Sequence, residues 1–268
     1  MSVVELEIND GIAVVTLNRP EVMNAMNPEL IVKLERAWLT VRDNPAVRVA
    51  ILTGAGTKSF SSGADLGRLI PLLSGARPPE DEYDRAIMTD KDLMARASLQ
   101  TLDVSKPVIA AVNGYAMAGG MEMLQGTDLR VASTTATFGL REVQRGLVAH
   151  GGSCVRLARQ VPYVQAMEIL LLGDAFDAAK ALEIGLVNYV VEPDQVMDKA
   201  MDMARRIAAN GPLAVQLTRR AVRECLGRPE RDALALEDEI GMTVYATEDA
   251  KEGPRAFVEK REPDFVGR

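Results

Sequence analysis

A short apolar run, residues 108–112, leads directly into a small-residue turn and the start of a helix. The run ends at Asn113-Gly114, which is typical of a buried strand that enters a turn. Residues 118–120 are all small and allow close approach to the main chain. An apolar segment with helical spacing follows them at once. A strand, a small-residue turn and a helix start together direct free backbone N–H groups toward negative charge.

Two glutamates lie within or just after this segment. Glu122 falls in the first turn of the predicted helix, and Glu142 follows a second predicted strand at 129–132. Two carboxyl groups in unlike environments can serve as a general acid and a general base. Taken alone, Glu122 is better explained as a partner of the helix dipole. Glu142, which lies between Arg141 and Arg145, could be a salt-bridged surface group.

The composition excludes several functional classes. The chain has 268 residues and a formal net charge of −7, which argues against a nucleic-acid surface. The length suits one large domain or one domain with a smaller appendage. No apolar stretch approaches a membrane span, and the N-terminus does not resemble a signal peptide. Cys154 and Cys225 are isolated, which favours a reducing compartment. We therefore expect a cytoplasmic protein without membrane or nucleic-acid partners.

The segment GAGTKS, residues 54–59, does not match either nucleotide-binding motif. A phosphate-binding P-loop requires a glycine before Lys58, and a dinucleotide fingerprint requires a glycine where Ser59 stands. The following FSSGADL segment, residues 60–66, predicts a glycine-containing turn, and Asp65 could cap a helix there.

His150 and Cys154 suggest a second kind of chemistry. One helical turn separates them, so they could form a nucleophile and base, or half of a zinc site. His150 is the only histidine, and no second cysteine lies nearby. We therefore expect a polar residue at a helix start and a small thiol, with no metal site. A glycosidase is disfavoured because the chain has only 4% aromatic residues to bind sugars.

Other elements follow from local patterns. Alternating residues around Asp10-Gly11 predict a hairpin, and Asn27-Pro28 predicts the N-terminus of a helix. Residues 67–81 are predicted to form a mobile loop. Residues 82–102 are predicted to form one helix. From residue 193 on the pattern is helical only.

Several motifs carry a family resemblance. The segments NGYAMAGGMEM and FGLREVQRGL, together with EGPRAFVEKREPDF near the C-terminus, resemble the crotonase superfamily of enoyl-CoA hydratases and isomerases. The resemblance implies an α/β fold with a ββα spiral catalytic core over residues 1–192. It also implies a helical C-terminal oligomerisation region, residues 193–268, in a homotrimer or homohexamer.

The same resemblance implies a site. The backbone N–H groups of Ala64 and Gly119 would form an oxyanion hole, and Glu122 and Glu142 would flank the substrate double bond. Coenzyme A would enter as part of the substrate, with no permanently bound cofactor. The residues implied to contact the substrate or its coenzyme A are Ala25, Ala64, Asp65, Leu66, Gly119, Phe257 and Lys260.

The implied activity is addition of water to a trans-2-enoyl-CoA, giving a 3-hydroxyacyl-CoA in fatty-acid or related acyl-CoA metabolism. Alternatives are an enoyl-CoA isomerase, a carnitinyl-type acyl-CoA dehydratase, or an acyl-CoA-binding protein of low activity. The sequence departs from the family pattern at three places. Arg141 stands where proline is usual, residues 149–150 replace a common Pro-Gly pair, and Ala118 replaces the first residue of a glycine triplet.

Overall fold

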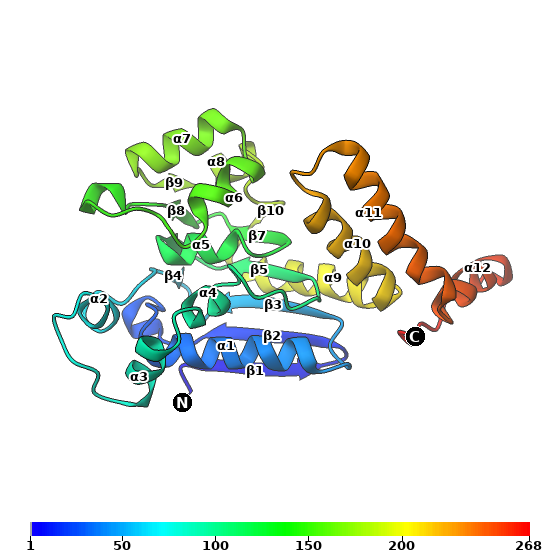
Figure 1. Ribbon diagram of the computed structural model, residues 1–268, viewed down its shortest axis with the longest axis horizontal. Coiled ribbons are helices and arrows are strands. Elements are labelled where there is room, and N and C mark those ends of the chain that lie inside the picture. Colours follow the sequence, from blue (N-terminus) through cyan, green and yellow to red (C-terminus); the bar gives the residue numbers. More distant parts are fainter. Residues whose placement is uncertain (1) are drawn as a thin grey trace.

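The computed structural model describes residues 2–268 (Figure 1). Its chain begins with the predicted hairpin, in which β1 (Val4–Asn9) and β2 (Ile12–Leu17) pair antiparallel from Val4↔Leu17 to Asn9↔Ile12. Asp10 and Gly11 both have positive φ, 50° and 77°. This is the conformation that two-residue hairpin turns require and that the Asp-Gly sequence favours. The predicted hairpin is confirmed.

A six-stranded sheet forms the centre of the molecule, in the order β1-β2-β3-β5-β7-β10. All neighbours after the hairpin pair in parallel. Parallel strands need helical crossovers and are covered on both faces, so they consist of continuous apolar runs. The four additional strands are β3 (Val49–Gly54), β5 (Val108–Val112), β7 (Leu129–Ser133) and β10 (Tyr189–Val191).

A second, smaller sheet has the order β4-β6-β8-β9. Strands β3, β5 and β7 of the large sheet are each followed by a strand of this small sheet. The chain therefore alternates between the two sheets as it winds, which is the predicted ββα spiral. The small-sheet strands are β4 (Ser59–Ser61), β6 (Tyr115–Met117), β8 (Thr137–Gly139) and β9 (Phe176–Asp177).

Alternation along the strands divides the core between the two faces of the large sheet. Ala50 and Leu52 of β3 belong to the larger cluster, which includes α1 (Pro28–Asp43) with its fully buried Trp38. Val49 and Ile51 face the other way and pack with α9 (Val196–Ala208). The N-terminus of α1 is capped as predicted, because Asn27 accepts a hydrogen bond from the Leu30 N–H.

The prediction of one helix over residues 82–102 is wrong. The segment forms α3 (Glu82–Thr89) and the short α4 (Leu93–Ala97). Asp90 between them is extended, and its carboxylate pairs with Arg96 at 2.5 Å. Asp90 is the C-cap residue of α3, and the helix ends there although the apolar pattern continues to residue 102. Residues 67–81 also contain a helix, α2 (Leu69–Leu73), that was not predicted.

The remaining helices fall into two groups in Figure 1. Helices α5 (Gly119–Leu124), α6 (Ser153–Gln160), α7 (Tyr163–Leu172) and α8 (Ala178–Glu183) surround the small sheet. Helices α10 (Pro212–Cys225), α11 (Glu230–Met242) and α12 (Asp249–Glu259) extend away from the sheets. In the part of the chain that the structure describes, no strand follows residue 193. No described helix is long and apolar enough to cross a membrane.

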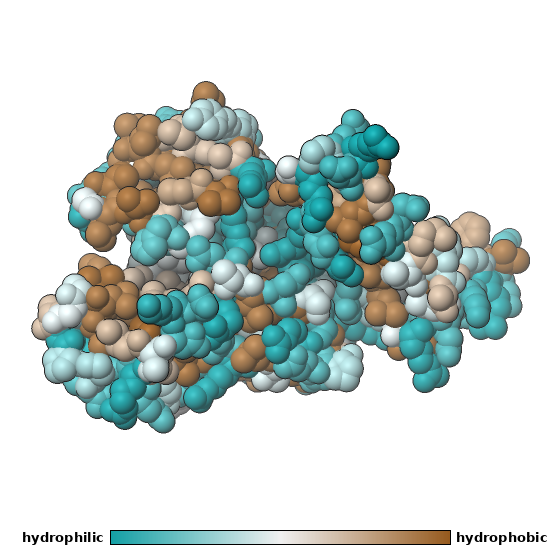
Figure 2. Space-filling model, viewed as in Figure 1, coloured by the Kyte–Doolittle hydropathy of each residue, from teal (hydrophilic) through white to brown (hydrophobic). Residues whose placement is uncertain are grey.

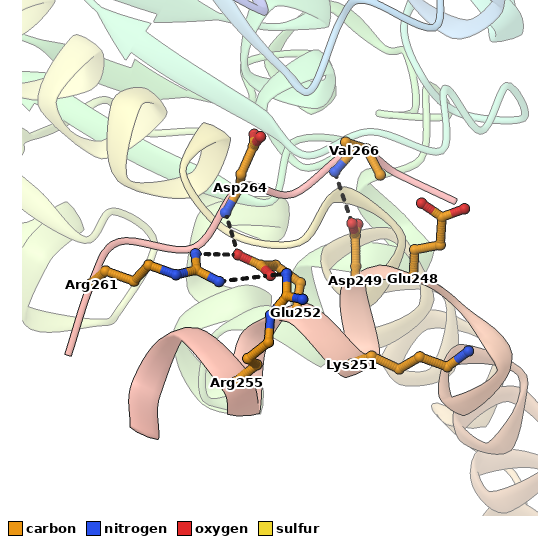
Figure 3. A pocket seen from close by; sticks show the side chains of 8 residues that line it. All are labelled: Glu248, Asp249, Lys251, Glu252, Arg255, Arg261, Asp264 and Val266. Carbon is orange, nitrogen blue, oxygen red and sulfur yellow. Dashed lines mark hydrogen bonds and ion pairs between the residues drawn. The ribbon is translucent and has the colours of Figure 1, made fainter. Parts of the chain in front are cut away.

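The C-terminal tail folds back along α12, as Figure 3 shows. Glu252 accepts hydrogen bonds from the Arg261 guanidinium at 2.5 and 3.0 Å and from the Asp264 N–H at 3.0 Å. Asp249 accepts from the Val266 N–H at 2.8 Å. The Arg261 guanidinium holds the pKa of the Glu252 carboxyl well below its ordinary value. The described residues around the 520 Å³ cavity between tail and helix include neither predicted catalytic glutamate.

Candidate active site

Two main-chain bends face each other at the end of the small sheet. Gly63 and Ala64 follow β4, whereas Ala118 and Gly119 follow β6, and these two strands are paired. A Cβ atom built on Gly63 would lie 3.0 Å from the Gly119 nitrogen, and one built on Gly119 would lie 3.9 Å from the Ala64 nitrogen. The structure therefore brings together the two predicted oxyanion segments.

The N–H groups of Ala64 and Gly119 are both available to a ligand. Neither has a hydrogen-bond acceptor among residues 2–268. Gly119 is the first residue of α5, a position whose N–H has no acceptor within the helix. Two preorganised donors at adjacent bends can stabilise negative charge that develops on a carbonyl oxygen.

The segment ahead of α1 lies against the bend that follows β4. The Met26 N–H donates to the Gly63 oxygen at 2.8 Å, and the Asp65 N–H donates to the Met26 oxygen at 3.0 Å. The Arg19 guanidinium donates to Asp65 Oδ2 at 2.9 Å and to the Ala25 main-chain oxygen at 2.6 Å. Arg19 therefore holds two predicted substrate-contact residues, Ala25 and Asp65, side by side.

Three other predicted contact residues lie on the surface. Leu66 is exposed next to the same bend. Phe257 is 85% exposed on α12, and Lys260 follows this helix at its C-terminus. In Figure 1, α12 lies at the right-hand end of the molecule, far from α5. Within this one chain, Phe257 and Lys260 are therefore not brought to the other predicted site residues.

The two predicted catalytic glutamates interact electrostatically. Glu122 lies in α5, is 8% exposed, and accepts a hydrogen bond on Oε1 from the Gly151 N–H at 2.7 Å. Burial and the negative charge of Glu142 raise the pKa of Glu122 to about 7. Burial also raises the pKa of Glu142. Two such carboxyl groups do not both ionise readily, so the pair retains a proton near neutral pH.

Glu142 differs from Glu122 in its hydrogen bonding. It directly precedes a 3-10 turn, η2 (Val143–Arg145), and its Oε2 atom is buried without a partner among residues 2–268. Because burial and the negative charge of Glu142 raise the pKa of Glu122 to about 7, the proton that the resting pair retains lies on Glu122. The unlike surroundings of the two glutamates suit an acid and a base.

Gly151 was not among the predicted site residues. Besides its hydrogen bond to Glu122, it leaves no room for a side chain, because a Cβ there would lie 2.3 Å from Glu122 Oε2. The sequence signal for this position is the glycine pair 151–152, which by itself indicates only a turn at a helix start. The structure shows α6 beginning at Ser153, with Gly152 in the left-handed region at φ 114°.

His150 and Cys154 do not pair with each other in the structure. The His150 Nδ1 atom lies 3.1 Å from the Val148 oxygen, and the Cys154 thiol donates to the Ala149 oxygen at 3.3 Å. Both contacts are to the main chain, which favours the non-catalytic interpretation of this pair. Nowhere in residues 2–268 do three or more His, Cys, Asp or Glu side chains group closely enough to hold a metal ion.

The surface around these residues is apolar. Figure 2 shows hydrophobic residues on both sides of an indentation between the α2–α3 segment and the α6–α8 segment. Leu147 and Val148, which follow Glu142, are 53% and 63% exposed, and Leu73 of α2 is 45% exposed. Such a patch is compatible with an apolar ligand group next to the two carboxyls.

Comparison with known proteins places this geometry in a family. A family model described as enoyl-CoA hydratase/isomerase matches residues 7–268. This chain belongs to the enoyl-CoA hydratase/isomerase family. The predicted membership of the crotonase superfamily is therefore confirmed, together with the predicted spiral fold.

The relatives cover nearly the whole chain. Enoyl-CoA hydratase EchA19 of Mycobacterium tuberculosis is 44% identical over 95% of this chain and 93% of its own length. Crotonyl-CoA hydratase of Syntrophomonas wolfei is 35% identical over 98% of this chain and 97% of its own. A crystal structure of an enoyl-CoA hydratase from Mycobacterium tuberculosis superimposes with a TM-score of 0.89 and 38% identity, covering 100% of both chains.

Proposed function

We propose that this protein is an enoyl-CoA hydratase that converts a trans-2-enoyl-CoA and water into a 3-hydroxyacyl-CoA. One observation carries the proposal: the buried Glu122 and the half-buried Glu142 both have raised pKa values, and Glu122 follows closely on one of two facing bends whose N–H groups have no acceptor among residues 2–268. The similarity to named hydratases over the full chain supports the same activity.

The two bends would bind the thioester. The carbonyl oxygen of the substrate would accept hydrogen bonds from the N–H groups of Ala64 and Gly119. As the oxygen of water attacks C3, negative charge moves onto this carbonyl oxygen, where the two donors stabilise it. Each donor of this kind typically contributes about 10²–10³ in rate.

The two glutamates would move the protons. In the reactive protonation state, in which the single proton of the pair lies on Glu142, the Glu122 carboxylate accepts the Gly151 N–H and takes one proton from the attacking water as the C3–O bond forms. Glu142 gives its proton to C2 as the negative charge on the thioester oxygen collapses. Glu122 ends protonated and Glu142 ionised, and one proton must return from the first to the second before the next turnover. General acid and base groups each typically contribute about 10²–10⁴ in rate.

The decisive experiment follows the absorbance of crotonyl-CoA, which falls as its conjugated double bond is hydrated. We expect activity in the natural protein and a loss of at least about 10²-fold in Glu122→Gln and in Glu142→Gln. Both variants should still bind the thioester, because the bends are unchanged. Absence of activity on short, medium and long enoyl-CoA substrates, or full activity in both variants, would reject the proposal.

We further propose that the chain works as a cytoplasmic homotrimer or homohexamer through residues 193–268. Phe257 and Val258, 85% and 79% exposed on α12, would pack against a second copy, and Lys260 would lie beside the coenzyme A of that copy. Phe257→Ser should then lower the oligomer mass in sedimentation, and Lys260→Ala should raise KM without lowering kcat. An unchanged mass and an unchanged KM would contradict this arrangement.

A further inference from the structure

A tight loop ahead of α1 lies against both bends of the candidate site. It runs from Arg19 to Met26 and is closed on itself, because the Arg19 N–H donates to Asn24 Oδ1 at 2.9 Å and the Asn24 N–H donates to the Arg19 oxygen at 2.9 Å. The Asn24 side chain is fully buried and donates to the Ser59 oxygen of β4 at 2.8 Å. The loop is therefore anchored to the strand that leads into the first bend.

Met26 contacts both bends. Its main chain pairs with Ala64 in a parallel bridge, through its hydrogen bonds with Gly63 and Asp65. Its side chain reaches the second bend, because a Cβ atom built on Gly119 would lie only 2.7 Å from Met26 Cε. Met26 is buried, so neighbouring atoms confine this side chain. The separation of the Ala64 and Gly119 N–H groups therefore depends on where Met26 lies.

Arg19 joins the loop to the first bend a second time. Its guanidinium donates to the main-chain oxygen of Ala25 and to Asp65 Oδ2, the residues that directly flank Met26 and Ala64 in the chain. The side chains of Arg19 and Asp65 are only 13% and 15% exposed. This shielded ion pair therefore holds the loop in place beside the Ala64 N–H.

Stability alone does not account for this ion pair. Asp65 already caps the turn that follows it, because its Oδ1 atom accepts from the Gly67 and Arg68 N–H groups at 3.0 and 3.1 Å. An asparagine would make the same two contacts. An ion pair that is shielded from water adds little to the free energy of unfolding, since its desolvation cost offsets the attraction. What arginine adds is a rigid fork that holds two oxygens at once.

We propose that Arg19 and Met26 are positioning residues for the oxyanion hole. Arg19 fixes the loop to the Ala64 bend, and Met26 carries that position across to Gly119, so that the two N–H groups converge on one carbonyl oxygen. The inference rests on the proposed function, in which these N–H groups stabilise charge on the thioester oxygen. It adds which side chains set the geometry of two donors that are themselves main-chain groups.

The test combines kinetics with the infrared stretch of a bound carbonyl. Butanoyl-CoA is a saturated thioester that cannot be hydrated, and with an isotope label at its carbonyl carbon its stretch is distinguished from those of the protein. In Arg19→Met we expect kcat for crotonyl-CoA to fall by about 10- to 10²-fold with little change in KM, because misplaced donors lose stabilisation mainly in the transition state. The carbonyl frequency of bound butanoyl-CoA, lowered by the two donors, should return toward that of the free thioester.

Asp65→Asn tests the same ion pair from its other end. It retains the two main-chain caps but loses the charge that Arg19 meets, so kcat should fall by less than in Arg19→Met. In the double variant the loss should equal that of Arg19→Met alone, because Asp65 acts through Arg19. Additive losses would overturn the inference. If Arg19→Met does not fold, Asp65→Asn by itself must lower kcat and move the carbonyl frequency.

Met26→Ala tests the contact with the second bend. It opens space beside Gly119 and should lower kcat several-fold, again with a moved carbonyl frequency. The matched control is Met203→Ala in α9, because Met203 is equally buried but packs on the other face of the large sheet. Met203→Ala should lower thermal stability and leave kcat and the carbonyl frequency at their natural values.

Lys106→Met is the matched control for Arg19. Lys106 Nζ donates to the Val41 and Asn44 main-chain oxygens at 3.0 and 3.2 Å, so it also ties two main-chain segments together. It precedes β5, at the end of that strand away from the bends. Lys106→Met should therefore lower thermal stability without affecting kcat.

The two readouts distinguish failure of the positioning roles from failure of the proposed function. If the natural protein hydrates no enoyl-CoA, the proposed function fails, and a carbonyl frequency that still returns toward the free value in Arg19→Met supports the positioning roles. If the natural protein is active while Arg19→Met and Met26→Ala keep its kcat and its carbonyl frequency, only the positioning roles fail.

Discussion

The main-chain N–H of Gly151 donates a 2.7 Å hydrogen bond to Oε1 of Glu122, and a Cβ atom on Gly151 would lie only 2.3 Å from Oε2. A side chain at position 151 therefore displaces the carboxyl that the proposed chemistry uses. The displaced atoms are the flexible end of Glu122, so the fold should tolerate the change. We predict that Gly151→Ala lowers kcat by about 10²-fold, the usual contribution of a general base, with little change in the melting temperature.

The matched control for this prediction is Gly241→Ala. Gly241 lies inside α11, and no atom lies within 4 Å of its would-be Cβ. Alanine there should stabilise the helix by about 1 kcal/mol relative to glycine and leave kcat unchanged. Full activity in Gly151→Ala would show that the position of the Glu122 carboxyl is not limiting.

The rate of hydration should follow a bell-shaped pH profile. The proposed mechanism needs one proton on the pair, so activity is lost at low pH, when both carboxyls are protonated, and at high pH, when both are ionised. Burial and the charge of Glu142 raise the pKa of Glu122 to about 7. Since kcat/KM reports the free enzyme, we predict that kcat/KM declines above about pH 7. A flat profile from weakly acidic to alkaline pH would contradict this prediction.

Local elements could be predicted from the sequence because short patterns specify them. Asp10-Gly11 specifies a hairpin turn, and Asn27-Pro28 specifies a helix start. The break at Asp90 was missed because it depends on Arg96, which also reaches across to Glu35 on α1 at 2.6 Å. A contact between distant segments is not visible in local periodicity. The order of strands in the large sheet could not be predicted either, because it also depends on contacts between distant segments.

The candidate site was likewise predictable from the sequence only where local patterns specify it. Small residues at 118–120 could be interpreted as a bend with free N–H groups from the sequence alone. The proximity of Glu122 to Glu142 could not, because it depends on the pairing of β6 with β8 in the small sheet, and only the family resemblance supplied it. Gly151 was missed as a neighbour of Glu122 because it lies in a segment far along the chain, just before α6. Its contact with Glu122 arises only in the folded protein.

The raised pKa of Glu122 should also affect how the free energy of unfolding depends on pH. The carboxyl has a pKa of about 7 in the folded protein, compared with its ordinary value of 4.5. The folded state therefore binds more protons than the unfolded state between these values, and stability falls as pH rises through this range. Above pH 7 Glu122 is ionised in the folded protein, and the free energy of unfolding is lower by up to about 3 kcal/mol.

We therefore predict that Glu122→Gln is more stable than the natural protein at pH 8, and that this gain disappears below about pH 4.5. Denaturant unfolding at several pH values measures the difference. Equal stability of the two proteins at pH 8 would show that Glu122 ionises without a penalty in the folded state.

The last prediction concerns Ala118, which has φ 49° and ψ −126° at the start of α5. This conformation favours glycine, and a residue with a Cβ atom is strained in it by about 1–3 kcal/mol. Ala118→Gly should relieve the strain, although glycine increases the entropy of the unfolded chain by about 0.4–1 kcal/mol. We expect a net stabilisation of about 1 kcal/mol, with kcat close to the natural value because Gly119 keeps its place. The control is Ala116→Gly in β6, where φ is not positive and glycine should destabilise the strand. Equal destabilisation in both variants, measured by thermal unfolding, would mean that the Ala118 bend is not strained.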